Sequence, residues 1–410
     1  MSKQYLTAKI KLVPTLEQEQ LLWQISDEAR RLYNLALEQQ RMIYSHRKVG
    51  LSFYDQKKEL KDIRKEYFPN LHSQVAQEVI FDLKEAYTSF FRLIKTDKTA
   101  RPPRFRGKKY FYTLTYPQAS YHLEDNKIVL HNPINWLTIN FADGYKDIAN
   151  IKALKQVEIS YQDNNYYACI TCEVIPERQV TTGKITTFDP GVKTLLTGYD
   201  GERIITVESK AHHKTAKYFD KSLDEIKSKL DRAKNGSKRH RRLVKAKKRT
   251  QKKRNRRMKQ INHSIAKELT KMNYDAYYIG DWAKKNTLAK TNSKRANKRI
   301  NRAVQNQLPV SQFIDYLKYK SELKGNQVLK VKEANSTKTC SSCNHTNPKL
   351  SPSVRTFTCN SCGYSIGRDE NAAINLYKWY AAQVTGLVQN QVNIKFVFGR
   401  YNKCLIQTSV

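Results

Sequence analysis

Acidic residues are scarce in this sequence: 37 Asp and Glu stand against 75 Lys and Arg in 410 residues, which leaves a net charge of +38. So large an excess goes beyond what solubility requires and indicates a polyanionic partner. A membrane surface would be one such partner, but no stretch approaches about 18 consecutive apolar residues and no amphipathic lipid anchor stands out. The composition therefore predicts a nucleic-acid-binding protein with no membrane partner.

Two further absences concern location and redox chemistry. The first residues, MSKQYLT, contain no apolar signal region, so we expect a cytoplasmic protein. Six of the seven cysteines fall in three CxxC pairs, a pattern that favours metal binding over disulfides. The pair Cys169 and Cys172 lies in strand-like sequence, where residues three apart point to opposite faces, so we expect these two to be packing residues. Cys404 has no partner and carries no evident chemistry.

The remaining cysteines predict a zinc ribbon. Cys340 and Cys343 are followed, after fifteen intervening residues, by Cys359 and Cys362. Two CxxC knuckles at this spacing suit tetrahedral thiolate coordination of one zinc ion. Four thiolates leave no position for a substrate, so the predicted role of the zinc is structural.

The order of periodic segments predicts a β-domain divided by a helical insert. Residues 4–13 read as a strand, and Thr15 with Gln18 forms a capping box at the start of a helical region over residues 15–95. Strand-like segments follow to about residue 174, with a hairpin turning at residues 163–165. Length alone predicts two to four domains.

Two basic segments are candidates for nucleic-acid contact. Residues 101–118 (RPPRFRGKKYFYTLTYPQ) mix basic and aromatic side chains, which suits backbone contact with base stacking. Residues 238–259 hold 14 Lys or Arg and no acid, within helix-compatible sequence. A helix along a nucleic-acid backbone is the favoured interpretation, with steeply salt-dependent affinity. The candidate contact residues are Arg104, Arg106, Lys108, Arg241, Arg242, Lys245, Arg249, Lys253 and Arg257.

A carboxylate stands at the end of the strand that opens the second half of the chain. Residues 185–198 (ITTFDPGVKTLLTG) predict a strand, a tight turn and a second strand, with Asp189 closing the first. An acid among apolar neighbours suits metal-dependent phosphodiester chemistry, although Asp before Pro-Gly is also an ordinary turn. The strands and helices from residue 184 onward predict a mixed α/β sheet of the RNase H type.

FDPGVK, the basic helical region, STKTCSSC with CNSCG, and GRDENAAINL together resemble the TnpB family of transposon-encoded proteins, relatives of the type V CRISPR effectors. The resemblance implies a multidomain α/β protein. Its parts are a split β-barrel wedge domain (1–14 and 100–180), a helical recognition domain (15–99), a RuvC-like domain (181–334 and 364–383) and a zinc ribbon (335–363). It implies a guide RNA, a double-stranded target DNA and a short duplex motif beside the target. Residues 384–410 form a tail to which the family's motifs assign no role.

The same resemblance implies three nuclease carboxylates. Asp189 matches the first and Asp369 the third, while Gly280 stands where the second, a Glu, is expected. Asp281 and Glu370 are possible substitutes: Asp281 if Gly280 permits a bulge that re-aims it, or if the alignment is off by one. The resemblance also suggests that Tyr54, Gln77 and Thr115 read the duplex motif, with ordinary surface residues as the alternative.

Three functions stay open on this evidence. The first, which the replacement of the expected Glu by Gly280 favours, is a nuclease-inactive, RNA-guided DNA-binding protein. It would be similar to the nuclease-dead TnpB-like repressors, would act near a prokaryotic nucleoid and would hold only structural zinc. The second is an active RNA-guided endonuclease that uses Mg²⁺ at Asp189 and Asp369 with a substitute acid. The third is a zinc-ribbon RNA-binding protein without a DNA target. Neither the guide, the target nor any protein partner can be inferred from the sequence.

Overall fold

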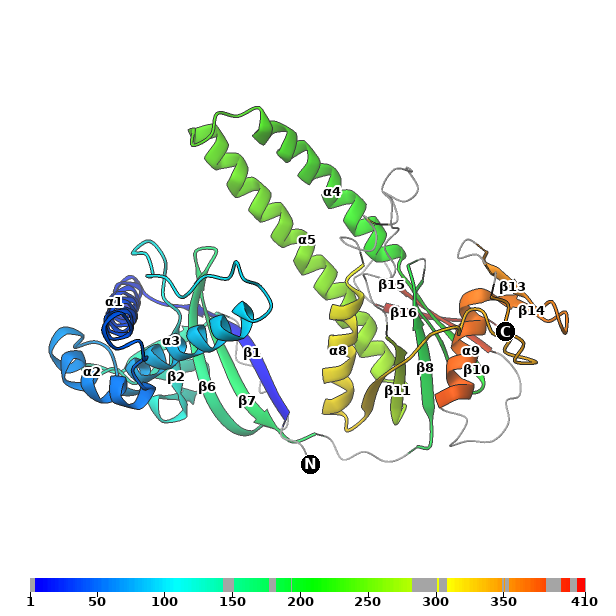
Figure 1. Ribbon diagram of the computed structural model, residues 1–410, viewed down its shortest axis with the longest axis horizontal. Helices are drawn as coiled ribbons and strands as arrows, with labels where there is room; N and C mark the ends of the chain where they lie inside the picture. Colours follow the sequence, from blue (N-terminus) through cyan, green and yellow to red (C-terminus); the bar gives the residue numbers. More distant parts are fainter. Residues whose placement is uncertain are drawn as a thin grey trace. The chain divides into compact units, whose positions relative to one another are not determined.

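A computed structural model describes residues 4–142, 151–176, 182–192, 194–281, 301, 308–348, 350, 354–380, 392–398 and 404–409. The chain divides into two compact units, Met1–Ile175 and Pro176–Val410 (Figure 1). Within the described ranges, none of the helices is both long enough and apolar enough to span a bilayer.

The first unit is built on an antiparallel seven-stranded sheet. Its strand order is β2 (Leu114–Pro117), β6 (Ile151–Gln162), β7 (Asn165–Val174), β1 (Gln4–Val13), β5 (Leu137–Phe141), β4 (Lys127–Leu130), β3 (Tyr121–Glu124). The two edge strands, β2 and β3, are joined by a single 3₁₀ turn, η1 (Gln118–Ser120). Since three residues span only a few ångströms, the sheet curls until its edges approach at one end. The chain thus forms a nearly closed sheet.

Three helices cover this sheet: α1 (Leu16–Arg47), α2 (Phe53–Tyr67) and α3 (Ser73–Ile94). The predicted capping box begins α1, because the Gln18 N–H donates to Thr15 Oγ1 at 3.3 Å and the Thr15 N–H donates to Gln18 Oε1 at 3.0 Å. The helical content of residues 15–95 is confirmed, with α2 as an element that the periodicity did not separate.

The hairpin β6–β7 confirms the predicted turn. Asp163 and Asn164 have φ values of 55° and 60°, the left-handed conformation that a two-residue hairpin turn requires and that Asp and Asn tolerate. Cys172 is buried and its Sγ lies 3.5 Å from the Leu6 carbonyl oxygen, whereas Cys169 is half-buried. The two side chains alternate across the strand, as expected of packing residues.

The second unit contains a mixed seven-stranded sheet. Its order is β12 (Gln327–Val331), β11 (Ala276–Gly280), β8 (Ile185–Pro190), β9 (Thr194–Tyr199), β10 (Arg203–Glu208), β15 (Val392–Phe398), β16 (Cys404–Ser409). Strands β8, β9 and β10 form an antiparallel meander, while β11 and β12 run parallel to β8. The last two strands come from the stretch to which the sequence assigned no role, and they extend the sheet beyond β10.

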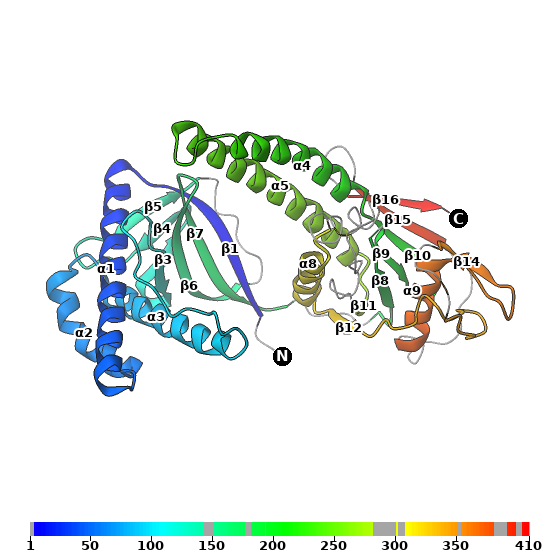
Figure 2. The same ribbon diagram turned by 45° about the horizontal axis from the view of Figure 1, so that its top comes forward.

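Helices cover both faces of this sheet. On one face, α5 (Lys238–Thr270) and α8 (Val310–Leu323) pack against Phe188 and Ile205. On the other, α9 (Arg368–Tyr380) packs against Tyr199 and Ile204. The neighbours Ile204 and Ile205 therefore belong to different cores, because successive strand residues point to opposite faces. Helix α4 (Lys210–Asp231) runs beside α5 in both views (Figures 1 and 2).

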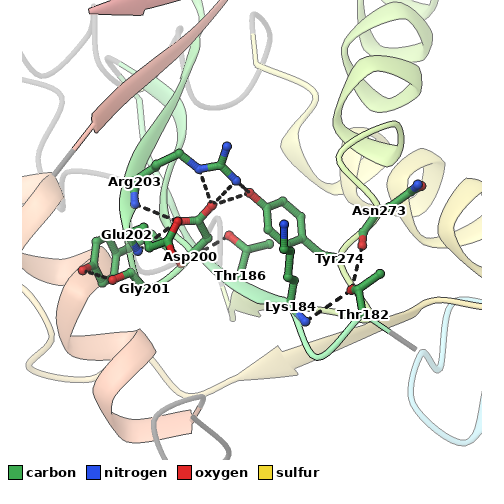
Figure 3. A network of polar contacts seen from close by, with 10 residues as sticks. Thr182, Lys184, Thr186, Asp200, Gly201, Glu202, Arg203, Asn273 and Tyr274 are labelled. Atoms are coloured by element: carbon green, nitrogen blue, oxygen red, sulfur yellow. Dashed lines mark hydrogen bonds and ion pairs between the residues drawn. The ribbon is translucent and has the colours of Figure 1, made fainter. Parts of the chain in front are cut away.

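A polar network joins the β9–β10 turn to the segment before β11 (Figure 3). The Tyr274 hydroxyl donates to Asp200 Oδ2 at 2.6 Å, and Arg203 Nε donates to the same oxygen at 2.9 Å. Burial, with the Asp200 carboxylate beside it, raises the pKa of Tyr274. Because Asp200 is engaged by both partners, we assign it a structural role and exclude it from the candidate site.

A buried histidine in the α4–α5 contact predicts acid sensitivity. His212 is fully buried and its Nε2 lies 2.7 Å from Asn262 Oδ1. Burial lowers the pKa of His212 from 6.5 to about 4, so the folded protein holds it neutral. The unfolded chain binds the proton first, so this contribution to stability is complete above pH 6.5 and is lost as the pH falls towards 4. The loss amounts to about 3 kcal/mol in full and about 2 kcal/mol by pH 5.

Thermal or urea unfolding from pH 7.5 to 5 measures this loss. The variant His212→Gln should flatten the pH dependence of the free energy of unfolding, whereas His240→Gln on α5 should keep the wild-type profile. Identical profiles for wild type and His212→Gln would remove His212 as the cause.

Candidate acidic centre, zinc site and nucleic-acid surfaces

The parallel strands β8, β11 and β12 align their carboxyl ends at one edge of the sheet. Ile279 pairs with Phe188, so the next residues in register are Gly280 and Asp189. Gly280 in turn pairs with Val331 of β12. Residues in register on neighbouring strands point to the same face. Asp189, Gly280 and Val331 therefore form one row across the sheet.

Glu333 occupies the space that the missing side chain of Gly280 leaves. A Cβ atom added to Gly280 would lie 3.3 Å from Glu333 Cβ, 3.2 Å from Pro190 Cδ, and closer to Glu333 Oε2 than real Cβ contacts allow. Glu333 stands two residues beyond Val331, and so returns to the same face of the extended chain. The carboxylate of Glu333 thus lies over the Gly280 backbone.

Asp369 reaches the same edge from the first turn of α9, and Arg368 Nη2 lies 3.1 Å from its Oδ1. Asp281 is exposed, and its N–H continues the ladder by donating to the Val331 carbonyl oxygen at 2.8 Å. Glu370 folds over Gly367, whose added Cβ would lie 2.9 Å from the Glu370 carboxyl carbon. The two substitutes considered from sequence therefore differ. Asp281 lies next to the row formed by Asp189, Gly280 and Val331, whereas the Glu370 side chain turns towards Gly367, just before α9.

The acids at this edge repel one another. Burial raises the pKa of Asp189 well above its usual value, the charges of Glu333 and then Asp369 raise it further, and Arg368 opposes them. Burial also raises the pKa of Glu333, with Asp281 adding to the effect. Clustered carboxylates of this kind are stabilised in their ionised form by a divalent cation.

The donor set fits magnesium. Carboxylate oxygens are preferred Mg²⁺ ligands, and Glu333 Oε2 is buried without a hydrogen-bond partner among the described residues. In the part of the chain that the structure describes, the four ribbon cysteines are the one group of three or more potential metal ligands whose ligand atoms all lie within 4.8 Å of one another. At the strand edge, Asp189, Glu333 and Asp369 are the residues that would hold Mg²⁺.

The sequence interpretation overlooked Glu333. Only Asp281, next to Gly280, and Glu370, next to Asp369, were considered as substitutes. A signal was present, because residues 327–331 (QVLKV) are strand-like and Glu333 follows them. Strands that run parallel bring their carboxyl ends to the same edge, so an acid after β12 belongs beside one after β8.

The four ribbon cysteines converge as predicted. Cys340 and Cys362 have their Sγ atoms 3.8 Å apart, and Cys343 and Cys359 have theirs 3.6 Å apart. A tetrahedron of thiolates around zinc has edges of about 3.8 Å, since the Zn–S bond is about 2.3 Å. The structure thus brings together a site that fits zinc.

Each knuckle is closed by a left-handed residue. Asn344 follows Cys343 with φ 63°, and Gly363 follows Cys362 with φ 72°. Their N–H groups donate to the carbonyl oxygens of Cys340 and Cys359, each at 3.0 Å. Asn and Gly are the residues that tolerate this conformation, which wraps each CxxC around a metal.

The predicted basic helix is α5. The candidates Arg241, Arg242, Lys245, Arg249 and Lys253 are exposed, while Arg257 is half-buried and Arg257 Nη1 donates to Gln260 Oε1 at 3.0 Å. Arg254 differs from them: it is buried and pairs with Asp220 of α4 at 3.4 Å. Most of the run is therefore a free cationic face, and one arginine anchors α4. A further basic stretch of the sequence, residues 284–303 (KKNTLAKTNSKRANKRINRA), lies outside the described residues except for residue 301.

The segment that holds Arg104, Arg106 and Lys108 is irregular and lies along α1. Asn34 holds the backbone of Arg106 from both sides, accepting from its N–H at 2.7 Å and donating to its carbonyl oxygen at 3.0 Å. The guanidinium of Arg41 lies over the Phe105 ring at 4.7 Å. All three basic candidates are exposed. The segment thus presents its basic side chains from a tethered backbone.

Tyr54 and Gln77 line one groove of about 460 Å³ between α2 and α3. The groove is strongly cationic, with Lys57, Lys58, Lys61, Arg64 and Lys65 also in its walls. Tyr54 is 76% exposed, so its ring is available to a ligand. Thr115, on β2, is not among the groove residues. The structure therefore brings together two of the three candidates for duplex contact.

Two protein-family models match the chain. One, described as "Cas12f1-like, TNB domain", matches residues 311–376, which include the zinc ribbon and Asp369. The other, described as "Helix-turn-helix domain", matches residues 1–48, although β1 and the single long helix α1 occupy that range.

Sequence relatives point the same way. The TnpB-like protein L79 of Acanthamoeba polyphaga mimivirus is 30% identical over 55% of this chain and 44% of its own length. The "Putative RNA-guided DNA endonuclease InsQ" of Escherichia coli is 24% identical over 74% of this chain and 73% of its own length. The chain is similar to TnpB-like proteins. It spans less than half of the mimivirus protein, and only 41% of a second one, the "Putative transposase R186", at 33% identity over 50% of this chain.

Solved structures show the fold of this chain. The protein in the Cas12f1–sgRNA–target DNA complex superposes with a TM-score of 0.60 at 13% identity, covering 91% of this chain and 98% of the other. The mini-RNA-guided endonuclease CRISPR-Cas_phi3 superposes with a TM-score of 0.51 at 11% identity, covering 95% and 94%. The chain therefore has a Cas12/TnpB-like α/β fold.

Proposed function

We propose that this TnpB relative is an RNA-guided DNA endonuclease that depends on Mg²⁺. Its nuclease acids would be Asp189, Glu333 and Asp369. One observation carries the proposal: the Glu333 carboxylate lies over Gly280, beside Asp189, in the space where a second acid was expected. The interpretation as a nuclease-inactive protein depended on a missing carboxylate, and this geometry favours the active alternative.

The sheet topology supports a nuclease of the RuvC type. The order β10-β9-β8-β11-β12, with an antiparallel meander followed by two strands parallel to its first, is that of the RNase H fold. In open α/β sheets, ligands bind beyond the carboxyl ends of the strands, where Asp189 and Glu333 stand. The Asp189 side chain leaves a strand fixed on both sides, so its position is rigid.

The acids would act as the holders of two Mg²⁺ ions, which supply an activated water and stabilise the leaving oxygen when bound. The chain's own residues prepare that site. Burial and then the repulsion between these acids raise the pKa of Asp189, and the repulsion favours cation uptake. Arg368 holds the side chain of Asp369 before the cation enters.

Guide RNA and target DNA are proposed partners because two relatives are named as RNA-guided DNA endonucleases and this chain carries a net charge of +38. The free face of α5 and the tethered segment 101–109 suit a phosphate backbone. The cationic groove with Tyr54 and Gln77 suits a short duplex motif beside the target, because it combines phosphate-binding lysines with polar groups that can reach base edges.

Neutralising the free face of α5 should weaken RNA binding. For the triple variant Lys245→Ala, Arg249→Ala, Lys253→Ala, we expect affinity at about 0.15 M salt to fall by about 10–100-fold. The salt slope should fall by up to about 3, since each phosphate contact contributes about 0.9. Binding titrations at several salt concentrations measure both. Lys227→Ala, an exposed lysine on α4 paired with Asp224, is the control; a triple variant with the wild-type slope would exclude this face.

The direct test of the function uses the ribonucleoprotein. The co-purifying RNA is sequenced, and the complex is incubated with a matching duplex, with and without Mg²⁺. The proposal expects cleavage that requires the matching sequence and Mg²⁺ and that Asp189→Ala abolishes. Specific duplex binding without cleavage in Mg²⁺ or Mn²⁺ would overturn it.

A nuclease-inactive repressor is the second candidate. The ion pair of Arg368 with Asp369, at 3.1 Å, favours it, because a guanidinium on the third acid competes with a cation. In that case, target binding would block transcription, and Arg368→Ala would permit cleavage, because it frees Asp369 for a cation. Cleavage by the wild-type ribonucleoprotein excludes this candidate.

A further inference from the structure

The segment after β12 carries both Glu333 and the first zinc knuckle. The Ser336 N–H donates to the Glu333 carbonyl oxygen at 3.1 Å, which begins a run of turns that ends at Cys340. Only six residues therefore lie between a proposed nuclease acid, Glu333, and a proposed zinc ligand, Cys340. Any element that holds this segment fixes both sites at once.

Helix α9 holds the segment through two asparagines, Asn371 and Asn375, both fully buried. The Asn375 amide donates to the carbonyl oxygens of Ser336 at 2.8 Å and Thr339 at 2.7 Å. The Asn371 amide donates to the same two oxygens, at 3.4 and 2.7 Å. Asn371 Oδ1 also accepts from the Ser341 N–H, inside the Cys340–Cys343 knuckle, at 2.9 Å. We call this pair the asparagine clamp.

The same helix is tied to the remaining acids. Asp369 is its second residue and lies two positions before Asn371. Thr187, two residues before Asp189 in β8, donates to the Ala373 carbonyl oxygen at 3.0 Å. At its other end, the Tyr380 hydroxyl donates to the carbonyl oxygen of Lys332, next to Glu333, at 3.0 Å. The three acid-bearing segments thus meet on one helix through buried or backbone-directed hydrogen bonds.

We propose that the asparagine clamp is a positioning device that couples the zinc knuckle to the acidic centre, an inference that rests in part on the proposed nuclease function. Asn371 and Asn375 touch neither substrate nor acid. They fix the distance between α9, which carries Asp369, and the segment that carries Glu333 and Cys340. Loss of the clamp therefore has two effects at once: it loosens the Cys340–Cys343 knuckle, and it lets Glu333 move away from Asp369. Both effects follow because the same hydrogen bonds, to the Ser336 and Thr339 carbonyl oxygens, hold the knuckle and the Glu333 segment on α9.

The geometry allows single variants that fold. Each carbonyl oxygen accepts from both amides, so Asn371→Leu and Asn375→Leu each leave one donor in place, and the double variant removes both. Asn262→Leu is the matched control. Asn262 is also fully buried in the second unit and also loses a hydrogen bond, to His212, but it lies on α5.

The experiment measures zinc release from the purified full-length ribonucleoprotein to a colorimetric chelator, and the Mg²⁺ concentration for half-maximal cleavage. For each single clamp variant, we expect about 10-fold faster zinc release and a half-saturating Mg²⁺ concentration raised about 10-fold, with more than additive effects in the double variant. Asn262→Leu should lower the melting temperature and leave both values unchanged.

Zinc release at the wild-type rate in folded clamp variants overturns the proposal. Faster release with an unchanged Mg²⁺ dependence overturns the coupling to the acids. If wild type does not cleave, the proposed nuclease function fails, and zinc release alone then decides whether the clamp holds the knuckle.

Discussion

Replacing Glu333 with Gln should abolish cleavage while leaving the ribonucleoprotein intact. The change keeps the shape of the side chain over Gly280 but removes the negative charge that a cation needs. We expect the single-turnover rate constant to fall by at least 10³-fold, equivalent to about 4 kcal/mol in the barrier. Guide-RNA and target affinities should stay within about 2-fold, because Glu333 is half-buried and is not one of the basic residues proposed to contact nucleic acid.

The matched controls are Glu370→Gln and Asp281→Asn, the two acids considered from sequence alone. Glu370 folds over Gly367, so its variant should keep activity within about 3-fold. Asp281 raises the pKa of Glu333, and we expect an effect of less than about 10-fold. If Asp281→Asn lost cleavage while Glu333→Gln stayed active, the second nuclease acid would be Asp281 and not Glu333.

Moving the carboxylate from position 333 to position 280 should restore a nuclease. Gly280→Glu alone should be damaging, because its Cβ would collide with Glu333 Oε2 and crowd Pro190. Glu333→Gly alone should be inactive, since it removes an acid. In the double variant, Gly280→Glu with Glu333→Gly, the new side chain lies in register with Asp189 and finds the space open. We expect the double variant to recover to within about 10-fold of wild type.

Plasmid cleavage assays on the four proteins, with melting temperatures as the folding check, measure this double-mutant cycle. The expected coupling is large and favourable. Two outcomes would contradict it. Gly280→Glu more active than wild type would mean that position 280 had lacked a needed acid. A folded double variant as inactive as Glu333→Gly would mean that the two positions do not serve the same site.

The local sequence was sufficient to predict several strands, the start of the first helix, the β6–β7 turn and the zinc ribbon. The alternation and caps of residues 4–18, the turn at Asp163 and Asn164, and the spacing of the four cysteines are all decided by contacts between residues close in sequence. Capping, left-handed turns and CxxC knuckles need no partner from elsewhere in the chain. The strand that ends at Asp189 was predictable for the same reason.

Glu333, the further acid of the acidic centre, could not be identified from local sequence patterns. Gly280 and Glu333 are separated by 53 positions, and they meet only because β11 and β12 run parallel and in register. The final strands β15 and β16 belong to the sheet for a similar reason: β15 pairs with β10, almost two hundred residues earlier. Such pairings depend on the assembled sheet, which periodicity within one segment does not specify.

By itself, the sequence determined a strongly basic chain with four cysteines at zinc-ribbon spacing, and it predicted Asp189 and Asp369 as two acids of one site. Only the tertiary structure decided whether a second acid joins them. Along strand β11 alone, Gly280 indicates that a carboxylate is missing. In the assembled sheet, Glu333 fills the space beside Gly280, because it follows β12, which runs parallel to β11 and ends at the same edge.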